Sequence, residues 1–260
     1  MKQLVCMKIT PKVEQIRFDE QKKTIIREGV ENEINEADKN ALEAALTLKG
    51  LHGGTVTVLS MGPPSFEPYL KLAIAMGADD AILLSDRSFA GADTFSTSRV
   101  LAQAIKKAGP FDIVFCGEAS SDGSTEQVPS SIAEWLDVPQ VTYANDVKIE
   151  NSKIIARRVI TGGYEIVETQ LPVLISVELG FNSPRFPDFR RKRWAEKEFK
   201  LTVWNREYLQ LSETEVGTQG SHTMVKETKS LPTPARKGEF LTGTPQEIAK
   251  KLAQVIKAAS

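Results

Sequence analysis

Short apolar runs alternate with amphipathic segments through the first two-thirds of the chain. The apolar runs predict strands over residues 4–7, 55–59, 81–84 and 112–116. Apolar residues at helical spacing predict intervening helices over residues 37–48, 70–76 and 94–107. Glycines mark the ends of these helices, at Gly53, Gly77 and Gly109. Strands that are nearly all apolar and separated by helices indicate an α/β fold, a parallel sheet with helices on both faces.

The pattern changes after about residue 145. Strand-like runs follow one another over residues 147–150, 154–160, 165–171 and 173–178. Gly162-Gly163 between two of them is typical of a tight hairpin turn. We therefore expect a small antiparallel addition, about residues 146–180, within a first domain that covers residues 1–204.

Residues 205–260 are expected to form a C-terminal arm. Residues 205–244 contain few apolar side chains and many Gly, Pro, Ser and Thr, which predicts an extended or loosely attached segment. Residues 245–259 form an amphipathic pattern, with Thr244 as the expected N-cap and Pro245 as the first helical residue. Such a helix can bind a partner subunit or pack back on its own core, and the sequence favours neither.

Composition and charge exclude several classes of function. The chain of 260 residues has 33 Lys and Arg against 34 Asp and Glu, which argues against a nucleic-acid-binding protein. Its apolar runs are far shorter than the roughly 18 residues of a membrane span. The N-terminus has no apolar stretch typical of an export signal, so we expect a cytoplasmic protein.

Few side chains could carry acid-base or nucleophilic catalysis. Cys6 and Cys116 are single residues at the ends of apolar runs, which predicts buried thiols. His52 and His222 have no neighbours at metal-ligand spacing, so a metal site is not expected. Any chemistry must therefore come from a cofactor.

The loop over residues 117–128 is the candidate ligand site, because ligands of parallel sheets bind beyond the carboxyl ends of the strands. It is rich in small and hydroxyl residues and precedes Pro129. Proline fits the first turn of a helix, so we expect a helix over residues 129–136, with the amides of residues 123–128 free for an anion. A capping box of Ser124 and Gln127, or a plain solvated connector, are the alternatives. Neither GxGxxG nor GxxxxGK[ST] occurs at the expected places.

Residues 181–206 are strongly basic, with eight Lys and Arg against three Asp and Glu. Phe186, Phe189 and Trp194 lie among these charges. Aromatic residues among arginines can stack on single-stranded nucleic acid, or can insert into a pocket of a protein partner. A solvated helix face is the third interpretation, and the charge of the whole chain favours a protein partner over nucleic acid.

Taken in order, several motifs resemble those of electron-transfer flavoprotein β subunits along nearly the full chain. These motifs are residues 5–8 (VCMK), 34–38 (INEAD), 41–45 (ALEAA), 60–63 (SMGP), 75–79 (AMGAD), 122–128 (DGSTEQV), 162–163 (GG), 171–172 (LP) and 182–186 (NSPRF). The resemblance implies a Rossmann-like, adenine-nucleotide-binding fold and a heterodimer with an α subunit. It also implies that the chain holds either AMP as a structural ligand or FAD.

The family's nucleotide contacts fall on three groups of residues in this sequence. They correspond to Cys6 and Met61; to Asn35, Glu36, Ala37 and Asp38; and to Gly117, Glu118, Ala119, Ser120, Ser121, Asp122, Gly123, Ser124, Thr125, Glu126, Gln127 and Val128. The run from Asp122 to Val128 resembles the subgroup that bifurcates electrons. In that subgroup the β subunit binds FAD, takes electrons from NADH, and passes them to ferredoxin and, through the α-subunit FAD, to a dehydrogenase. Gly123 would remove a side chain where the longer dinucleotide passes.

The basic cluster gains a role from the same resemblance. Family members dock an acyl-CoA or enoyl-CoA dehydrogenase through an apolar anchor at the place of Phe189, with Arg190, Arg191 and Arg193 beside it here. An AMP-holding electron shuttle remains the alternative within the family. A stand-alone nucleotide-binding regulator is the alternative of another class. Nucleic-acid and membrane partners are not expected.

Overall fold

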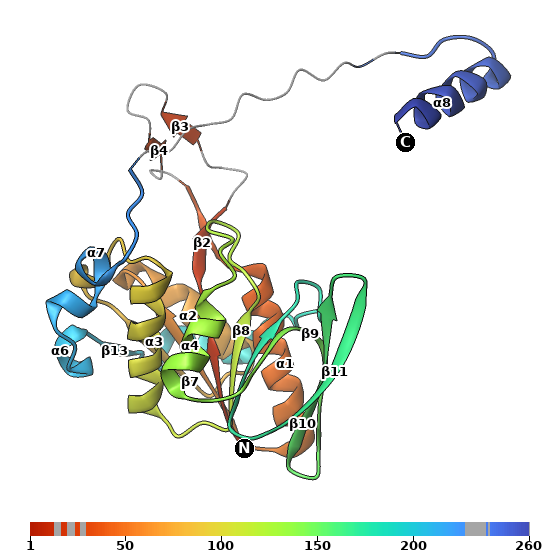
Figure 1. The fold of residues 1–260 in the computed structure, drawn as a ribbon. Helices are drawn as coiled ribbons and strands as arrows, with labels where there is room; N and C mark the ends of the chain where they lie inside the picture. The colour runs from red at the N-terminus through yellow and green to blue at the C-terminus, as the bar shows by residue number, and fades with distance from the viewer. Residues whose placement is uncertain (13–16, 20–23, 27–29, 227–237, 239, 260) are drawn as a thin grey trace. The chain divides into compact units, whose positions relative to one another are not determined.

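The computed structural model describes residues 1–12, 17–19, 24–26, 30–226, 238 and 240–259. The chain forms two compact units, Met1–Glu227 and Thr228–Ser260. Figure 1 traces both of them along the chain.

A sheet of nine strands forms the centre of the first unit. Its order is β11-β10-β9-β12-β8-β1-β6-β7-β13. The strand bounds are β1 (Lys2–Cys6), β6 (Thr55–Met61), β7 (Asp80–Leu84), β8 (Ile113–Gly117), β9 (Gln140–Glu150), β10 (Lys153–Ile160), β11 (Gly163–Gln170), β12 (Val173–Val177) and β13 (Thr202–Trp204). Neighbouring strands from β9 to β13 along this order run parallel, whereas β10 is antiparallel to both β9 and β11.

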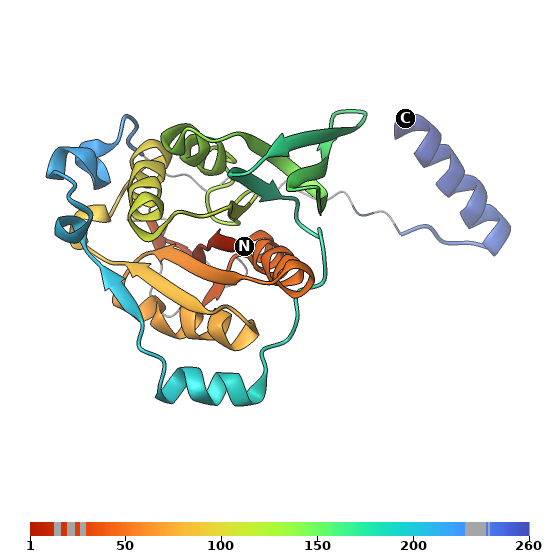
Figure 2. The same cartoon turned by 90° about the horizontal axis from the view of Figure 1, so that it is seen from below.

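Helices cover both faces of this sheet, as predicted. Figure 2 shows α1 and α2 on one face and α3 and α4 on the other. Their bounds are α1 (Glu36–His52), α2 (Glu67–Met76), α3 (Thr94–Ala108) and α4 (Val128–Leu136). Each face has its own apolar core, built around Phe115 on the side of α1 and around Leu4 on the side of α3. The predicted α/β class is confirmed.

The predicted helix boundaries are confirmed to within a few residues, because they depend on local backbone chemistry. Gly53 and Gly77 follow the last residues of α1 and α2 with φ of 70° and 134°, where a side chain would be strained. Pro129 lies in the first turn of α4, so the helix begins where the proline predicts and no capping box forms at Ser124.

One strand assigned to the antiparallel addition belongs elsewhere. The addition consists of β9, β10 and β11, with the Gly162-Gly163 turn between the last two. By contrast, β12 is parallel to both neighbours and lies between β9 and β8. All five of its residues are buried, which is typical of a strand covered on both faces. The consecutive apolar residues 173–175 were the signal for this position.

Much of the expected loose segment after residue 204 packs on the first unit instead. Leu209, Leu211 and Val216 are buried in the core on the side of α3. Short elements carry them: α6 (Arg206–Leu209), the 3-10 turn η4 (Glu213–Glu215) and α7 (Gly217–Gly220). Asp93, the N-cap of α3, also accepts hydrogen bonds from the amides of His222 (2.8 Å) and Thr223 (2.9 Å). The expectation that residues 205–244 are loosely attached is therefore wrong for residues 205–223.

The second unit contains α8 (Pro245–Ala259), which matches the predicted helix. The Thr244 amide donates to the Glu247 carboxylate (2.9 Å), and the Glu247 amide donates back to Thr244 Oγ1 (3.4 Å). This reciprocal pair confirms Thr244 as the residue that caps the helix. The expected contact of this helix with an α subunit stays a prediction.

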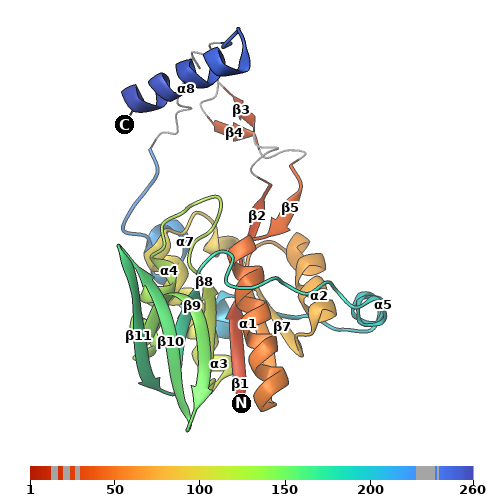
Figure 3. The same cartoon turned by 90° about the vertical axis from the view of Figure 1, so that its right-hand side faces the viewer.

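Further short elements complete the first unit. The 3-10 turns η2 (Pro64–Phe66) and η3 (Arg87–Phe89) precede α2 and α3. Two small ribbons join β2 (Ile9–Pro11) to β5 (Asn32–Ile34) and β3 (Arg17–Asp19) to β4 (Thr24–Ile26); Figure 3 shows the β2–β5 ribbon beyond the end of β1. The helix α5 (Phe189–Lys197) follows the sheet strand β12 and packs beside α2.

Candidate functional site

The order in which the chain adds strands to the sheet reverses at β1. From β1 the chain passes through α1 to β6 on one side, and it later returns from β7 to β8 on the other side. Loops after β1 and β8 therefore diverge around a shared edge, the usual ligand position in open α/β sheets. The predicted site residues at 6, 35–38 and 117–128 all come from this edge.

Asn35 and Asp38 form hydrogen bonds to the loops that follow β1 and β8. The Asn35 side chain donates to the Ala119 carbonyl (2.8 Å) and accepts from the Ser121 amide (3.1 Å). The Asp38 carboxylate accepts from the amides of Lys8 (2.8 Å) and Gly117 (2.9 Å). The start of α1 thus holds the loop after β1 and the loop after β8 together, and both side chains are buried.

Asp38 has an unusual electrostatic environment. It is 7% exposed, and burial raises its pKa to about 6, although the Lys8 and Gly117 amides oppose this rise. Burial of a charged carboxylate costs free energy of folding unless hydrogen bonds or an opposite charge compensate for the lost water. Here its two hydrogen bonds fix the backbone at both loops.

Gly117 fits against the start of α1 with no room for a side chain. A Cβ atom at this position would lie 2.6 Å from Asp38 Oδ1 and 2.7 Å from Ala37 Cβ. Glycine here therefore permits the close approach of the β8 end to α1 on which the Asp38 hydrogen bond depends.

Gly123 differs from Gly117, because a side chain there would make only ordinary contacts. A Cβ there would meet only Ser120 Oγ at 3.4 Å and Lys8 Nζ at 3.9 Å. The neighbouring residues Ser124 and Glu126 adopt left-handed φ values of 45° and 59°. Alternation of this kind turns successive amides toward one side, which favours anions. Among the described residues, the amides of Gly123, Thr125, Glu126 and Gln127 have no hydrogen-bond acceptor.

Lys8 contacts the predicted loop, although the sequence indicated it only as part of the motif of residues 5–8. Its Nζ donates to Asp122 Oδ1 (2.5 Å) and to Ser120 Oγ (3.1 Å). Partial burial raises the pKa of Asp122, but the hydrogen bond and charge of Lys8 outweigh this and hold the pKa below its ordinary value. A basic residue directly after the first strand, opposite a polar loop, was the available signal.

The same loop carries two acidic side chains, Glu118 and Glu126. Burial raises the pKa of Glu118, and the charges of Glu178 and Glu126 raise it further, although the Leu179 amide donates to its carboxylate. Glu126 accepts from the Tyr143 hydroxyl (2.6 Å). The carboxylates of Glu118 and Glu126 therefore accept hydrogen bonds from other residues of the chain, whereas Lys8 supplies positive charge beside Ser120 and Asp122.

The other residues predicted to contact the nucleotide differ in their exposure to solvent. Cys6 is buried and packs in the core on the side of α3, where its thiol meets that of Cys116. Ala37 is buried, Met61 is half-buried at the end of β6, and Glu36 is exposed. Any ligand contact at Cys6 or Ala37 must therefore be made chiefly by the backbone. Ser120 is half-buried, whereas Ser121 and Thr125 are exposed on the loop, and Gln127 accepts from the Thr94 hydroxyl (2.9 Å).

The basic cluster forms a separate surface on α5. Phe189 is the first residue of this helix and is 79% exposed, while Phe186 just before it is 93% exposed. A hollow of about 630 Å³ is lined by Phe189, Arg190, Arg193, Trp194, Lys197 and Glu198. We call these residues the α5 surface. It combines uncovered aromatic rings with positive charge.

Arg191 differs from the three other predicted docking residues. Its guanidinium donates to the carbonyls of Ile74 (3.1 Å) and Ala78 (2.8 Å), at the end of α2. It therefore holds α5 onto α2, whereas Arg190 and Arg193 are exposed.

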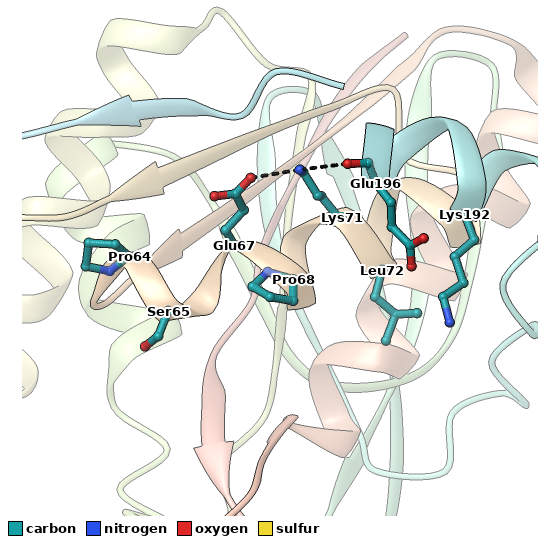
Figure 4. Close-up of a pocket in the computed structure, with 8 residues that line it drawn as sticks. All are labelled: Pro64, Ser65, Glu67, Pro68, Lys71, Leu72, Lys192 and Glu196. Carbon is teal, nitrogen blue, oxygen red and sulfur yellow. Dashed lines mark hydrogen bonds and ion pairs between the residues drawn. The ribbon is translucent and has the colours of Figure 1, made fainter. Parts of the chain in front are cut away.

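Figure 4 shows another hollow, of about 610 Å³, lined by residues from the segment 64–72, at the start of α2, and by Lys192 and Glu196 of α5. Its lining residues Lys71 and Glu67 form an ion pair (2.8 Å), and it includes no residue of the loops after β1 and β8, which we call the nucleotide loops for their predicted ligand.

In the described part of the chain, no helix is long and apolar enough to span a bilayer. The same residues contain no group of His, Cys, Asp and Glu side chains that could hold a metal ion.

Comparison with known proteins gives the same family throughout. The model of the electron transfer flavoprotein domain matches residues 22–204. The electron transfer flavoprotein subunit beta of Thermoanaerobacterium thermosaccharolyticum is 45% identical over 251 residues, which is 96% of each chain. The caffeyl-CoA reductase-Etf complex subunit CarD of Acetobacterium woodii is 43% identical over 260 residues, covering 99% of this chain and 98% of CarD.

A third relative, protein FixA of Azotobacter vinelandii, is 40% identical over 269 residues, covering 99% of this chain and 94% of FixA. Proteins of this family are flavoproteins that transfer electrons, and their β subunits pair with an α subunit. The predicted resemblance is confirmed, and the chain belongs to the electron transfer flavoprotein family as a β subunit.

Proposed function

We propose that this β subunit binds FAD and serves an electron-bifurcating complex. The observation that carries the proposal is the loop around Gly123, where amides without an acceptor lie beside Lys8 and a Cβ would meet only ordinary contacts. A pyrophosphate requires close approach to the backbone together with positive charge, and this loop offers both. Similarity to CarD, whose name places it in a caffeyl-CoA reductase-Etf complex, supports a role beside a CoA-dependent oxidoreductase.

The residues of this chain would bind and orient the nucleotide. The amides from Gly123 to Gln127 and the Lys8 ammonium would bind phosphate, with the Ser124 and Thr125 hydroxyls beside them. Asn35 and Asp38 would act indirectly, by holding the two loops at a fixed separation. Backbone at Cys6 and Ala37, together with Met61, would contact the remainder of the nucleotide.

When bound, FAD would supply the redox chemistry that side chains lack, namely two-electron exchange with NADH and single-electron exchange with ferredoxin and, through the α-subunit FAD, with a dehydrogenase. No side chain of this chain is assigned an acid-base step. NADH and ferredoxin as donor and acceptor place this activity in the cytoplasm.

The α5 surface would dock the dehydrogenase, an acyl-CoA or enoyl-CoA enzyme. Exposed aromatic rings are typical anchors of protein interfaces, and surrounding charges increase the rate of encounter with a partner of opposite charge. Phe189 would be the anchor, and Arg190 and Arg193 would favour an acidic docking site.

Cofactor stoichiometry in the complex of this chain with its α subunit tests the proposal. The nucleotides are released by denaturation, separated by chromatography and quantified by absorbance. We expect two FAD and no AMP per heterodimer. One FAD with one AMP would identify a simple electron shuttle and refute the proposal, because this chain would then hold no redox group.

A further inference from the structure

Two buried polar side chains of α1 face the segment that leads from β12 to α5. Asn40 is 4% exposed and Glu43 is 9% exposed. They are three residues apart, so they lie on neighbouring positions of one helix face. Asp38, which holds the nucleotide loops, lies in the preceding turn of the same helix.

Asn40 forms a reciprocal pair with Asn182. Asn40 Nδ2 donates to the Asn182 main-chain carbonyl (2.7 Å) and to Asn182 Oδ1 (3.0 Å). Asn182 Nδ2 donates back to the Asn40 main-chain carbonyl (3.0 Å). The Gly180 amide donates to Asn40 Oδ1 (3.1 Å). One side chain thus fixes the backbone at two points of the segment.

Glu43 forms a second attachment, to Arg185. Its carboxylate accepts from the Arg185 backbone amide (3.0 Å), from Nε (2.8 Å) and from Nη2 (2.9 Å). Burial raises the pKa of Glu43, but the Arg185 hydrogen bonds and charge outweigh it and keep the pKa below its ordinary value. The planar guanidinium matches the carboxylate at both oxygens, so this pair fixes orientation as well as distance.

The segment has little internal structure to set its path. Residues 181–188 contain no helix or strand, so side chains of neighbouring elements must satisfy much of its backbone. After Arg185 the Asp188 amide donates to the Ala75 carbonyl of α2 (3.0 Å), and α5 begins at the next residue. Figure 3 shows the segment passing α1 on its way to α5.

We propose that Asn40 and Glu43 are positioning residues for partner docking. Through Asn182 and Arg185 they set the place of the α5 surface relative to the nucleotide loops, which the same helix holds through Asp38. The inference rests on the proposed function, in which the α5 surface docks a dehydrogenase. Electron transfer between proteins requires a short and fixed separation, and one rigid helix attached at both places provides it.

Stability alone is a weak reason for this ion pair, because the Arg185 side chain is 44% exposed and ion pairs in contact with solvent contribute little to stability. Apolar residues of similar volume would cover α1 equally well but would not determine the path of an irregular segment. The geometry of the Glu43–Arg185 pair therefore indicates that it positions the segment before α5 rather than stabilising the fold.

The test uses the α/β heterodimer with its cofactors and the dehydrogenase. Glu43→Gln keeps the size of the side chain but removes its charge. Arg185→Lys keeps a charge beside the buried carboxylate but removes the planar fork, and it serves as the second variant if Glu43→Gln fails to fold. Glu134→Gln, at an exposed glutamate of α4, is the matched control.

Two measurements distinguish a role in positioning the segment from a role in the stability of the fold. Hydrogen exchange of residues 180–188 should become at least tenfold faster in both variants, while exchange in β1 and β8 stays unchanged. The KM for the dehydrogenase should rise at least fivefold, with flavin content and NADH-driven reduction of an artificial dye unchanged. The Glu134→Gln heterodimer should match wild type in each readout.

Unchanged exchange in the segment would overturn the inference. Faster exchange with an unchanged KM would also overturn it, provided that Phe189→Ala raises the KM. If Phe189→Ala leaves the KM unchanged as well, the proposed docking function itself fails, and the positioning role falls with it. In that case the exchange data alone report what the pair does to the segment.

Discussion

Gly117 at the end of β8 and Gly123 in the loop that follows provide a test of how the candidate site is built. We predict that Gly117→Ala destabilises the fold, whereas Gly123→Ala leaves the fold intact and reduces cofactor binding. A Cβ at Gly117 would lie 2.6–2.7 Å from Asp38 Oδ1 and from Ala37 atoms, while ordinary contacts begin at 3.4 Å. The end of β8 and the start of α1 would therefore have to separate by about 0.7 Å.

The expected cost at Gly117 has two parts. Overpacking of a tight interior costs about 1–3 kcal/mol. The displacement also weakens the hydrogen bond from the Gly117 amide to the Asp38 carboxylate, a charged bond of about 1.5–3 kcal/mol when intact. A combined loss of about 3 kcal/mol lowers the melting temperature by roughly 6–12 °C in a chain of this size.

At Gly123 the new methyl group makes only ordinary contacts, and φ does not lie in the left-handed region. We expect a change within about 0.5 kcal/mol, or roughly 1–2 °C. The same methyl group would occupy the space proposed for the pyrophosphate, so FAD content should fall severalfold.

Thermal unfolding of both variants is measured by circular dichroism after the nucleotide has been removed. Bound ligand stabilises the folded state, so unequal occupancy would otherwise distort the comparison. Cofactor content is measured separately on complexes as purified. A Gly117→Ala complex that melts within 2 °C of wild type would refute the packing argument. A Gly123→Ala complex with full FAD content would refute the proposed path of the cofactor.

Four further substitutions test other parts of the molecule. Lys8→Gln removes positive charge from the loop and should raise the nucleotide Kd at least tenfold in equilibrium titration, about 1.4 kcal/mol. Phe189→Ala removes the proposed anchor and should raise the dehydrogenase KM roughly 30-fold, equivalent to about 2 kcal/mol, with flavin content unchanged. Asp38 has a folded-state pKa of about 6, above its unfolded value, so its contribution to stability rises as the pH falls through 6 toward 4. Between pH 7 and pH 5 this contribution is about 1 kcal/mol, and urea unfolding of Asp38→Asn should lack it. Asp93 has a pKa lowered to about 2 by hydrogen bonds that outweigh its burial, so its contribution is present above pH 4 and is lost as the pH falls toward 2. Asp93→Ala should lower the melting temperature at pH 7 by roughly 2–4 °C, about 1 kcal/mol for a largely solvated cap, and an equal loss at pH 2 would contradict the assignment.

The sequence by itself determined the local elements. Apolar runs and helical spacing predicted the parallel strands and their helices, and Gly53, Gly77 and Pro129 predicted where helices begin or end. These signals are local, because they depend on backbone conformations that single residues favour or exclude. The assignment of a ligand site to the loop over residues 117–128 depends on the same kind of local signal and stays a prediction: the loop follows a buried strand and precedes a proline-initiated helix.

The tertiary structure alone decided which distant segments meet. Sequence placed β12 in the antiparallel addition, yet it lies parallel between β9 and β8, because burial on both faces outweighs its nearness in sequence to the hairpin. The roles of Asn35 and Asp38 as ties between loops, and of Glu43 as the partner of Arg185, join residues up to 142 positions apart. Such pairs carry no local pattern. They form only when the packed sheet and α1 bring the groups within hydrogen-bond distance in an environment from which water is largely excluded.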